Sequence, residues 1–265
     1  MGLHYRYPKD HGRLDLINEH EHGLVAFSLL KLREKETYRG NSGPYEIVIV
    51  LLGGIADVTV EGGEFRNLGA RTDVFSGRAT AVYIPRETNF SVEAPKGEVE
   101  AALCQVKADR KYAPFVVTPE EVTVSHRGNS LCEREIHDII GNNGRGRVDK
   151  IILGETFSFP GNWSSFPPHK HDRYAPPEEN ELVEVYHFRI LPDEGFGVQI
   201  TYTEDGHQEE AYVVRNGDTV LIPSGYHPVA APPGVKLYYL WFLAGTYGRE
   251  VLAATDPVFQ KLCGI

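Results

Sequence analysis

The sequence has few cysteines and no hydrophobic run long enough to cross a membrane. Its three cysteines, Cys104, Cys132 and Cys263, are widely separated, and no CxxC pair occurs. An odd, scattered set of this kind is typical of reduced thiols and argues against a disulfide framework. No apolar stretch approaches the ~20 residues of a transmembrane helix, and the N-terminal segment lacks the hydrophobic core of a secretion signal. These absences predict a cytoplasmic protein with no membrane partner.

The chain also lacks a dense cluster of basic residues and any pattern typical of a DNA-binding helix pair. It carries 27 Lys and Arg against 37 Asp and Glu, a formal net charge of −10. A protein that binds nucleic acid normally presents a basic patch to the phosphate backbone, so no nucleic-acid partner is expected. The 41% hydrophobic content of the 265 residues supports a packed core in one large or two ordinary domains.

Helix signals are weak, whereas strand signals recur along the whole chain. Short runs of β-branched and apolar residues alternate with glycine, proline and asparagine, as an antiparallel barrel or sandwich requires. One short turn of helix is expected at residues 257–262. The expected strands cover residues 46–52, 81–85, 98–103, 184–190, 197–202, 219–223 and 237–243.

An internal repeat suggests that the fold is duplicated. Residues 81–85 and 92–95 form a strand, a proline and a second strand that resemble residues 219–223 and 229–232. Chance similarity is the alternative; a true repeat predicts two β-barrels, with a boundary near residue 120 that gives domains 1–120 and 121–265. The first copy lacks histidine at the positions where the second has it. We therefore expect the C-terminal barrel to hold a metal and the N-terminal barrel to act as scaffold or lid.

Three histidines and one glutamate in the second half have the composition of a metal site. His169 and His171 are separated by one residue, so in an extended strand both point to the same face while Lys170 points away. His227 follows in a second glycine- and proline-rich segment, and Glu184 lies between them in a strand-like run. Three imidazoles and a carboxylate suit a divalent transition metal with positions open for substrate. The alternative for the histidine pair is a polar surface loop.

Glu184 is the preferred carboxylate because it shares a strand face with apolar side chains. Tyr186 and Phe188 lie on that same face, so Glu184 is expected to point inward. An unpaired buried charge costs several kcal/mol, and a metal ion would supply the partner. Three other glutamates lie in a proline-rich, charged loop where we expect a solvated role, namely Glu178, Glu179 and Glu181.

The motifs resemble those of a known family. The HxH pair, the later glutamate and the segment from Gly217 through Pro223 and Gly225 to His227 are similar to the two motifs of the cupin superfamily. More narrowly, residues 125–128, 161–172, 177–179 and 223–229 closely resemble the 5-deoxy-glucuronate isomerases of myo-inositol catabolism, which are bicupins. The related uronate ketol-isomerases of pectin breakdown have their metal glutamate in a Glu-Val-Tyr context, which matches residues 184–186.

This resemblance implies a fold, a reaction and a cofactor. The fold would be all-β, with two antiparallel jelly-roll barrels. The reaction would be aldose–ketose isomerisation of 5-deoxy-glucuronate to 5-dehydro-2-deoxy-gluconate, a small sugar-acid substrate, through an enediolate. The metal would be bound by His169, His171, Glu184 and His227. Zinc or manganese would be preferred, with iron or nickel as further choices. The assembly state is open, a homo-oligomer included.

The residues that would move protons or orient hydroxyls are less sharply indicated. Tyr186, on the inward face with Glu184, is the first candidate acid or base, and simple packing is its alternative. Gln199, Tyr202 and Tyr226 could orient substrate hydroxyls. The cation that would pair with the substrate carboxylate is left open among three residues, namely Arg173, Arg189 and Lys236.

Other functions would use the same four ligands. An iron-dependent dioxygenase of the cupin superfamily would consume oxygen, and a uronate ketol-isomerase would act on a related sugar acid. A non-enzymatic cupin would bind a sugar acid without turnover. Oxygen uptake and turnover of the sugar acid, measured together, separate these alternatives.

Overall fold

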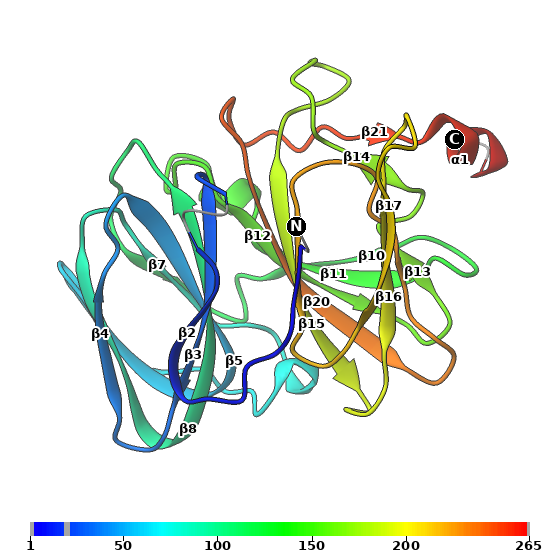
Figure 1. Cartoon of the computed structure of the whole chain (residues 1–265). Helices are drawn as coiled ribbons and strands as arrows, with labels where there is room; N and C mark the ends of the chain where they lie inside the picture. The colour runs from blue at the N-terminus through cyan, green and yellow to red at the C-terminus, as the bar shows by residue number, and fades with distance from the viewer. Residues whose placement is uncertain (1–2, 19–21, 264–265) are drawn as a thin grey trace. The chain divides into compact units, whose positions relative to one another are not determined.

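The computed structural model describes residues 3–18 and 22–263, and nearly all of its regular structure is β-strand (Figure 1). Each of the seven strands expected from the sequence overlaps an observed strand, and the expected C-terminal turn is helix α1 (Pro257–Cys263). The all-β prediction is therefore confirmed. The described part of the chain contains no helix long and apolar enough to span a membrane.

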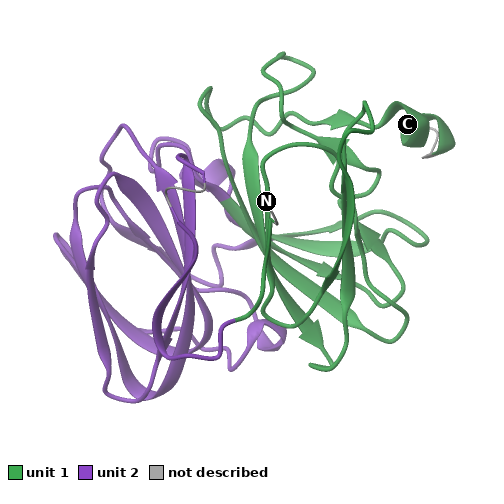
Figure 2. Ribbon diagram, viewed as in Figure 1, with its two compact units in different colours: residues 1–7, 124–137, 153–265 green, residues 8–123, 138–152 purple. Residues whose placement is uncertain are grey.

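The contact pattern divides the chain into two compact units (Figure 2). Unit 1 comprises residues 1–7, 124–137 and 153–265, and unit 2 comprises residues 8–123 and 138–152. The chain passes from unit 2 to unit 1 after residue 123, close to the domain boundary expected from the internal repeat. Two short segments belong to the unit built mainly from the other half of the chain: residues 1–7 to unit 1 and residues 138–152 to unit 2. A single boundary does not describe this arrangement, and the division at residue 120 stays a prediction.

Unit 2 is built around two long, bent strands. Strands β5 (Tyr45–Val60) and β8 (Asn89–Lys107) pair along most of their length, and their register shifts repeatedly near Gly53 and Gly54. A Cβ atom at Gly54 would lie 2.2 Å from the Glu98 carbonyl oxygen, and its φ of +92° favours glycine. These irregularities bend the strands. The remaining strands of the sheet are β2 (Gly12–Ile17), β3 (Val25–Leu32), β4 (Thr37–Asn41), β6 (Gly63–Leu68), β7 (Ala81–Ile84) and β9 (Phe115–Val117).

The interior of unit 2 is apolar, and one buried carboxylate fastens its second segment. The core cluster of β3, β5, β7 and β8 contains only hydrophobic side chains. Glu46 is fully buried and accepts hydrogen bonds from the backbone amides of Asp149, Lys150 and Ile151 at 2.6–2.8 Å. The Tyr83 hydroxyl donates a fourth at 2.9 Å. Glu46 thereby ties residues 149–151 to this unit.

Unit 1 has a larger sheet of seven strands and a smaller sheet of four. The larger sheet has the order β1 (His4–Tyr5), β18 (Thr219–Ile222), β15 (Val183–Leu191), β20 (Lys236–Ala244), β12 (Ile152–Ser158), β11 (Arg134–Ile140) and β10 (Thr123–Arg127). The smaller sheet has the order β13 (Trp163–Ser164), β19 (Val229–Ala230), β16 (Gly197–Tyr202) and β17 (Glu209–Val214). A two-stranded ladder joins β14 (His169–Lys170) to β21 (Ala254–Thr255).

The core of unit 1 is formed by side chains from both of these sheets. Phe188 of β15 and Val220 of β18 pack in one cluster with Val229 of β19 and Val214 of β17. The N-terminal β1 is fixed to β18 by Asp218, whose carboxylate accepts hydrogen bonds from His4 and Arg6 at 2.9 and 2.7 Å. Because side chains alternate along a strand, successive residues of β15 point in turn to this core and to the opposite face of the sheet.

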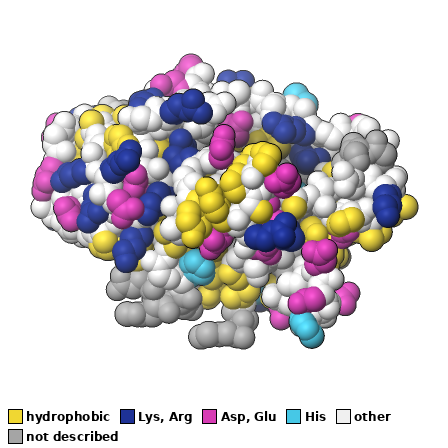
Figure 3. Space-filling view, turned by 90° about the horizontal axis from the view of Figure 1, so that it is seen from above, with side chains coloured by type: hydrophobic (Ala, Val, Ile, Leu, Met, Phe, Trp, Pro, Cys, Tyr) yellow, Lys and Arg dark blue, Asp and Glu magenta, His cyan; other side chains and the backbone are white. Residues whose placement is uncertain are grey.

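The surface and the thiols agree with the composition. On the face seen in Figure 3, Lys and Arg side chains are interspersed with Asp and Glu. Cys104 and Cys132 are free thiols. The side chain of Cys263 lies outside the described residues.

Candidate metal centre

Three separate segments of unit 1 deliver the side chains of the candidate site. His171 follows the short strand β14, Glu184 is near the start of β15, and His227 lies between β18 and β19. Glu184 is held on both sides, because its backbone pairs with Ile222 of β18 and Leu243 of β20. Its place in the middle of a sheet fixes the direction of its side chain.

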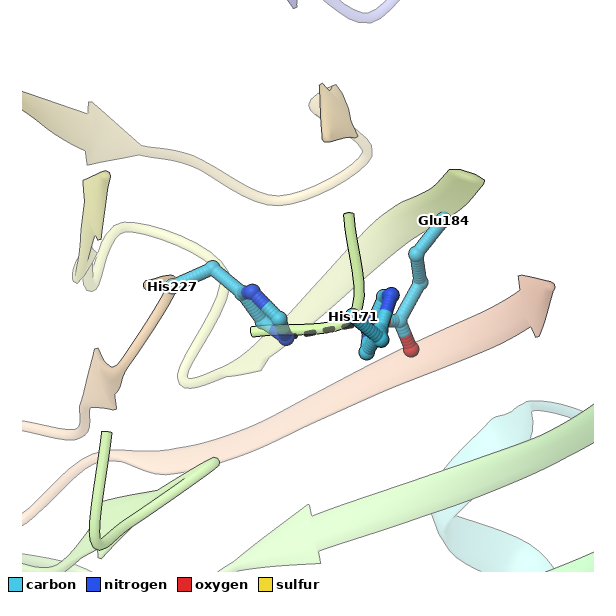
Figure 4. Close-up of side chains that lie close together, drawn as sticks. All are labelled: His171, Glu184 and His227. Carbon is cyan, nitrogen blue, oxygen red and sulfur yellow. Dashed lines mark hydrogen bonds and ion pairs between the residues drawn. The ribbon is translucent and has the colours of Figure 1, made fainter. Parts of the chain in front are cut away.

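The ligand atoms of His171, Glu184 and His227 all lie within 4.8 Å of one another, and all three side chains are buried. Figure 4 shows them converging from their separate segments. The Nε2 atom of His171 is 3.1 Å from Oε2 of Glu184, and Nε2 of His227 is 3.2 Å from the same oxygen. Within the described residues this is the one group of three or more His, Cys, Asp or Glu that meets this spacing.

The hydrogen bonds of the two imidazoles leave their Nε2 atoms directed at Glu184. Nδ1 of His171 lies 2.8 Å from the Leu182 carbonyl oxygen, and Nδ1 of His227 lies 2.9 Å from that of Gly225. Since a carbonyl only accepts, each Nδ1 carries a proton, and a neutral ring then has a lone pair at Nε2. In many proteins, a hydrogen bond from the other ring nitrogen to a carbonyl oxygen orients a metal-binding histidine in this way.

This donor set fits a divalent cation. Two nitrogen lone pairs and a carboxylate oxygen face each other at about 3 Å, an arrangement that repels unless a proton or a cation lies between them. Nε2 of His227 is buried and has no hydrogen-bond partner among the described residues. Two imidazoles and a carboxylate are the ligand types that zinc, manganese and iron accept in proteins.

Burial and the interactions between the ionisable groups shift the pKa values of Glu184 and His171. Burial opposes ionisation of Glu184, but the two imidazoles outweigh it and lower its pKa to about 2. Burial likewise disfavours protonated His171, yet hydrogen bonding to the Glu184 carboxylate leaves its pKa above the ordinary value. Glu184 is therefore ionised at neutral pH, and His171 is more readily protonated than an ordinary imidazole.

His169 lies beside this group but is not one of the three residues. Its ring centroid is 4.9 Å from that of His227 and 6.3 Å from that of His171. Its Nδ1 lies 3.2 Å from the Pro167 carbonyl oxygen, which leaves Nε2 as the unprotonated atom. Burial, together with His227 and His171, lowers the pKa of His169 to about 3, so the ring is neutral and able to bind a cation. The four-ligand set stays a prediction.

The back of the histidine pair is fastened by a buried carboxylate. Lys170 points away from its histidine neighbours, as its position in a strand predicts, and its Nζ lies 2.9 Å from Oε1 of Glu179 and 2.7 Å from Asp172. Glu179 is fully buried and also accepts the backbone amides of Asp172 and Arg173. The solvated role expected for Glu179 is therefore wrong, because the loop folds back onto the strand and supplies its own cations.

Asp172 links the segment that carries His169 and His171 to the segment that carries His227. Its Oδ2 accepts the backbone amide of Gly225 at 2.8 Å, two residues before His227. Its other oxygen is bound by Lys170. Movement of the histidine pair is thus coupled through Asp172 to the segment that carries His227.

Tyr186 lies on the inward face of β15, two residues after Glu184. Its hydroxyl is 2.8 Å from Oγ of Ser165, which is also 3.4 Å from the hydroxyl of Tyr239. Its ring centroid is 6.0 Å from that of His227. Burial, followed by the charge of Glu184, raises the pKa of Tyr186 well above its ordinary value, so the phenol is protonated at neutral pH.

The other residues predicted to orient hydroxyls are placed differently. Gln199 is fully buried on β16, and its Nε2 donates to the His227 carbonyl oxygen at 2.9 Å. Tyr202 and Tyr226 lie on the opposite strand face with ring centroids 5.0 Å apart. The Tyr202 hydroxyl donates to Asp256 at 2.6 Å. These two tyrosines hold the His227 segment from behind.

None of the three candidate carboxylate-binding cations lies in the cluster of ligands. Arg189 is on the strand face opposite Glu184, 4.9 Å above the ring of Tyr7. Arg173 is 68% exposed beside Glu179, and Lys236 lies 6.0 Å from the ring of Phe157. His187, also on the opposite face of β15, is fully buried and bonds Thr219, a structural role.

Three residues around the site were not singled out from the sequence, namely Asp172, Ser165 and Thr201, and a fourth, Glu179, was expected to be solvated. Asp172 and Ser165 adjoin the histidine motif, but only their contacts reveal their function. Glu179 has the composition of a surface loop. Thr201 lies two residues from Gln199, so strand alternation alone could have placed it on the same inward face.

Known proteins resemble this chain over almost its whole length. A curated 5-deoxy-glucuronate isomerase of Geobacillus thermodenitrificans is 38% identical over 241 residues, which cover 90% of this chain and 87% of that protein. One from Bacillus subtilis strain 168 is 34% identical over 237 residues, covering 89% of this chain and 86% of that protein. The crystal structure of an IolB-like protein from Salmonella typhimurium superposes with a TM-score of 0.93 at 30% identity, covering 99% of this chain and all of that one.

A more distant likeness concerns the fold alone. Oxalate decarboxylase of Lactobacillus farciminis superposes with a TM-score of 0.65 at 11% identity, over 99% of this chain and 90% of that one. Together with the two antiparallel units, this confirms the predicted bicupin fold. The model of the KduI/IolB family matches residues 6–262, and with relatives this similar across both barrels the chain belongs to the KduI/IolB family.

Proposed function

We propose that this protein is an isomerase that converts 5-deoxy-glucuronate to 5-dehydro-2-deoxy-gluconate, with a divalent metal held by His169, His171, Glu184 and His227. The observation that carries the proposal is the buried group of His171, Glu184 and His227. It lies in a chain 38% identical to a curated 5-deoxy-glucuronate isomerase over 90% of its length. Family and ligand geometry, which are independent, favour the same chemistry.

The reaction moves hydrogen within one molecule. A proton leaves C2, next to the aldehyde, to a base, and a proton returns to C1, while the hydroxyl proton on the C2 oxygen is lost and the C1 oxygen gains one, so that the aldehyde becomes an alcohol and C2 becomes a ketone. No external oxidant or reductant is needed. The intermediate is an enediolate, and its negative charge is the main obstacle to the reaction.

A bound divalent ion would supply Lewis acidity for two neighbouring substrate oxygens. Zinc or manganese suits this role because no change of oxidation state is involved. His171 and His227 hold their lone pairs in place through the carbonyl oxygens of Leu182 and Gly225. Glu184 adds one negative charge, so that a divalent ion would keep a net charge of +1.

The protein's own side chains then handle protons and hydroxyls. Tyr186 is a protonated phenol on the inward face beside Glu184, and Ser165 bonds its oxygen. We assign it as the acid that donates to the developing oxyanion. Gln199 orients a substrate hydroxyl, while Tyr202 and Tyr226 support the segment of His227 from the other strand face.

A direct assay tests this function. Metal-loaded protein is incubated with 5-deoxy-glucuronate, and the NMR signal of the aldehyde proton is followed while an electrode records oxygen. The signal should disappear as the ketone forms, with no oxygen consumed. Persistence of the aldehyde signal would contradict the proposal, and oxygen consumption would indicate a dioxygenase instead.

Tyr186→Phe provides the matching variant. Because general acid catalysis contributes about 10²–10⁴-fold, kcat should fall at least a hundredfold while the metal content is unchanged. Tyr202→Phe removes a hydroxyl from the opposite strand face and should retain most of the turnover. Equal losses in the two variants would argue against a catalytic role for Tyr186.

A further inference from the structure

The inward face of β16 carries two polar groups that the fold does not satisfy. Gln199 is fully buried and Thr201 is 2% exposed. Oε1 of Gln199 and Oγ1 of Thr201 have no hydrogen-bond partner among the described residues. Both belong to the buried, alternate positions of the strand that begin with Gly197, where a Cβ atom would meet Leu237 of the core. These atoms therefore face the interior of unit 1.

The register of the sheet places Thr201 beside the metal ligands. Gln199 pairs with Val229, and Tyr202 pairs with Tyr226 through two backbone hydrogen bonds. This constant register puts Thr201 opposite His227. Directly opposed residues of an antiparallel pair have Cβ atoms about 5 Å apart on the same face. The Thr201 hydroxyl is thus a neighbour of the His227 side chain.

The amide of Gln199 has a fixed orientation. Its Nε2 donates to the carbonyl oxygens of His227 at 2.9 Å and of Ile200 at 3.0 Å. Oε1 must point the other way, and it can only accept. Thr201 Oγ1 can donate or accept. Two residues apart on one strand, the side chains are spaced by about 7 Å, similar to the length of an extended six-carbon chain.

Buried polar atoms without partners are uncommon in folded proteins because each one costs free energy. Two of them on one strand, next to a metal-binding histidine, call for a ligand that can form the missing hydrogen bonds. A chain of hydroxyl groups has this chemistry, since each hydroxyl both donates and accepts.

We propose that Gln199 Oε1 and Thr201 Oγ1 bind hydroxyl groups of a polyhydroxy acid and set the specificity of the site for such acids. The inference rests on the proposed function, which it deepens by naming the residues that recognise the hydroxylated part of the substrate. Gln199 accepts a hydrogen bond from one hydroxyl, and Thr201 bonds a second one nearer the metal ligands. An acid without hydroxyls leaves both protein atoms unsatisfied and is rejected.

The test compares two ligands and two variants of zinc-loaded protein. Gluconate is a polyhydroxy acid with no aldehyde to isomerise, and hexanoate has the same chain length without hydroxyls. Their dissociation constants are measured by calorimetry for wild type, Thr201→Val and Thr201→Ser. Wild type should prefer gluconate. Thr201→Val should weaken gluconate about tenfold, the loss expected for one hydrogen bond, and leave hexanoate unchanged. Thr201→Ser should retain the preference.

Thermal unfolding without ligand separates recognition from a structural role. Replacing an unpaired buried hydroxyl by a methyl group is neutral or stabilising, so Thr201→Val should unfold at the wild-type temperature or above it. A lower unfolding temperature in Thr201→Val but not in Thr201→Ser would identify a structural hydrogen bond and overturn the proposal. So would equal weakening of both ligands, or a wild type that does not prefer gluconate.

Failure of this inference is distinguishable from failure of the proposed function. The binding preference for gluconate is measured without turnover, so it can hold even if 5-deoxy-glucuronate is not isomerised. Conversely, normal isomerisation by Thr201→Val with an unchanged KM would remove only the specificity role. The kcat of Thr201→Val at saturating substrate should stay within severalfold of wild type, while KM rises.

Discussion

The Nε2 atom of His227 lies 3.2 Å from Oε2 of Glu184, and no hydrogen bond of its own satisfies it within the described residues. Glu184 is on β15, whereas His227 lies beyond β18, and the pairing of β15 with β18 brings them together. The lone pair of a ring nitrogen and a carboxylate would not be buried face to face without a positive charge between them. This relationship is the physical reason to expect a metal, and it leads to the predictions that follow.

Removal of one imidazole should abolish tight metal binding. His171→Ala deletes a ligand that is held by the Leu182 carbonyl oxygen, so the metal content after dialysis should fall from near one ion per chain to a trace. His207→Ala, in an exposed turn, is the control and should keep its metal. Elemental analysis of both proteins measures the outcome. Full metal content in His171→Ala would refute the ligand assignment.

Metal affinity should rise with pH. The pKa of His171 lies above its ordinary value, since the Glu184 carboxylate outweighs the effect of burial. Below that pKa a proton occupies the nitrogen that the metal needs, and affinity should fall up to about tenfold per pH unit. Above it the affinity should level off, because Glu184, with a pKa of about 2, is already ionised. Calorimetry in buffers of different ionisation enthalpy should detect proton release on binding, and a flat profile from mildly acidic to neutral pH would contradict this.

Glu179, the buried carboxylate behind the histidine pair, should affect the metal affinity of the site without contacting the metal. Glu179→Ala removes the partner of Lys170 and of two backbone amides, so the segment that carries His171 loses its support. Loss of a group that holds the metal ligands in position typically lowers metal affinity about 10–100-fold. The neighbouring Glu178→Ala, exposed in the same loop, should leave affinity unchanged. Identical affinities in the two variants would show that the network does not position the ligands.

A fourth prediction concerns stability rather than chemistry. Glu46→Ala leaves the amides of Asp149, Lys150 and Ile151 and the Tyr83 hydroxyl without their acceptor. Several buried donors without partners should lower the free energy of unfolding by at least about 3 kcal/mol. Glu64→Ala, on an exposed position of β6, is the control and should change stability by less than about 0.5 kcal/mol. Denaturant unfolding measures both, and matching midpoints would refute the anchoring role.

Strand alternation was enough to predict much of the site. The two-residue period places His169 and His171 on one face and Lys170 on the other, and it separates Glu184 and Tyr186 from His187. The same rule limits the set of hydroxyl-orienting residues, since Gln199 and Tyr202 have opposite parity on β16 and point to opposite faces. Local periodicity is set by backbone geometry, which each residue carries in any sheet.

The burial of Glu179 could not be predicted in this way. A glutamate two residues after a double proline, in a charged segment, has the composition of a solvated loop. It is buried because the chain turns back at Pro176 and Pro177 and brings Lys170 and two amides to one carboxylate. That return depends on contacts between residues with no common periodic pattern.

By itself, the sequence determined the β-strands, the faces on which their side chains lie, the residue types of the candidate metal centre and the family motifs. The tertiary structure alone decided that Glu184 meets His171 and His227, that Thr201 lies opposite His227, and that residues 1–7 belong with unit 1. The reason is physical: side-chain alternation is a property of one strand, whereas register and neighbour order are set by pairing between segments far apart in the chain.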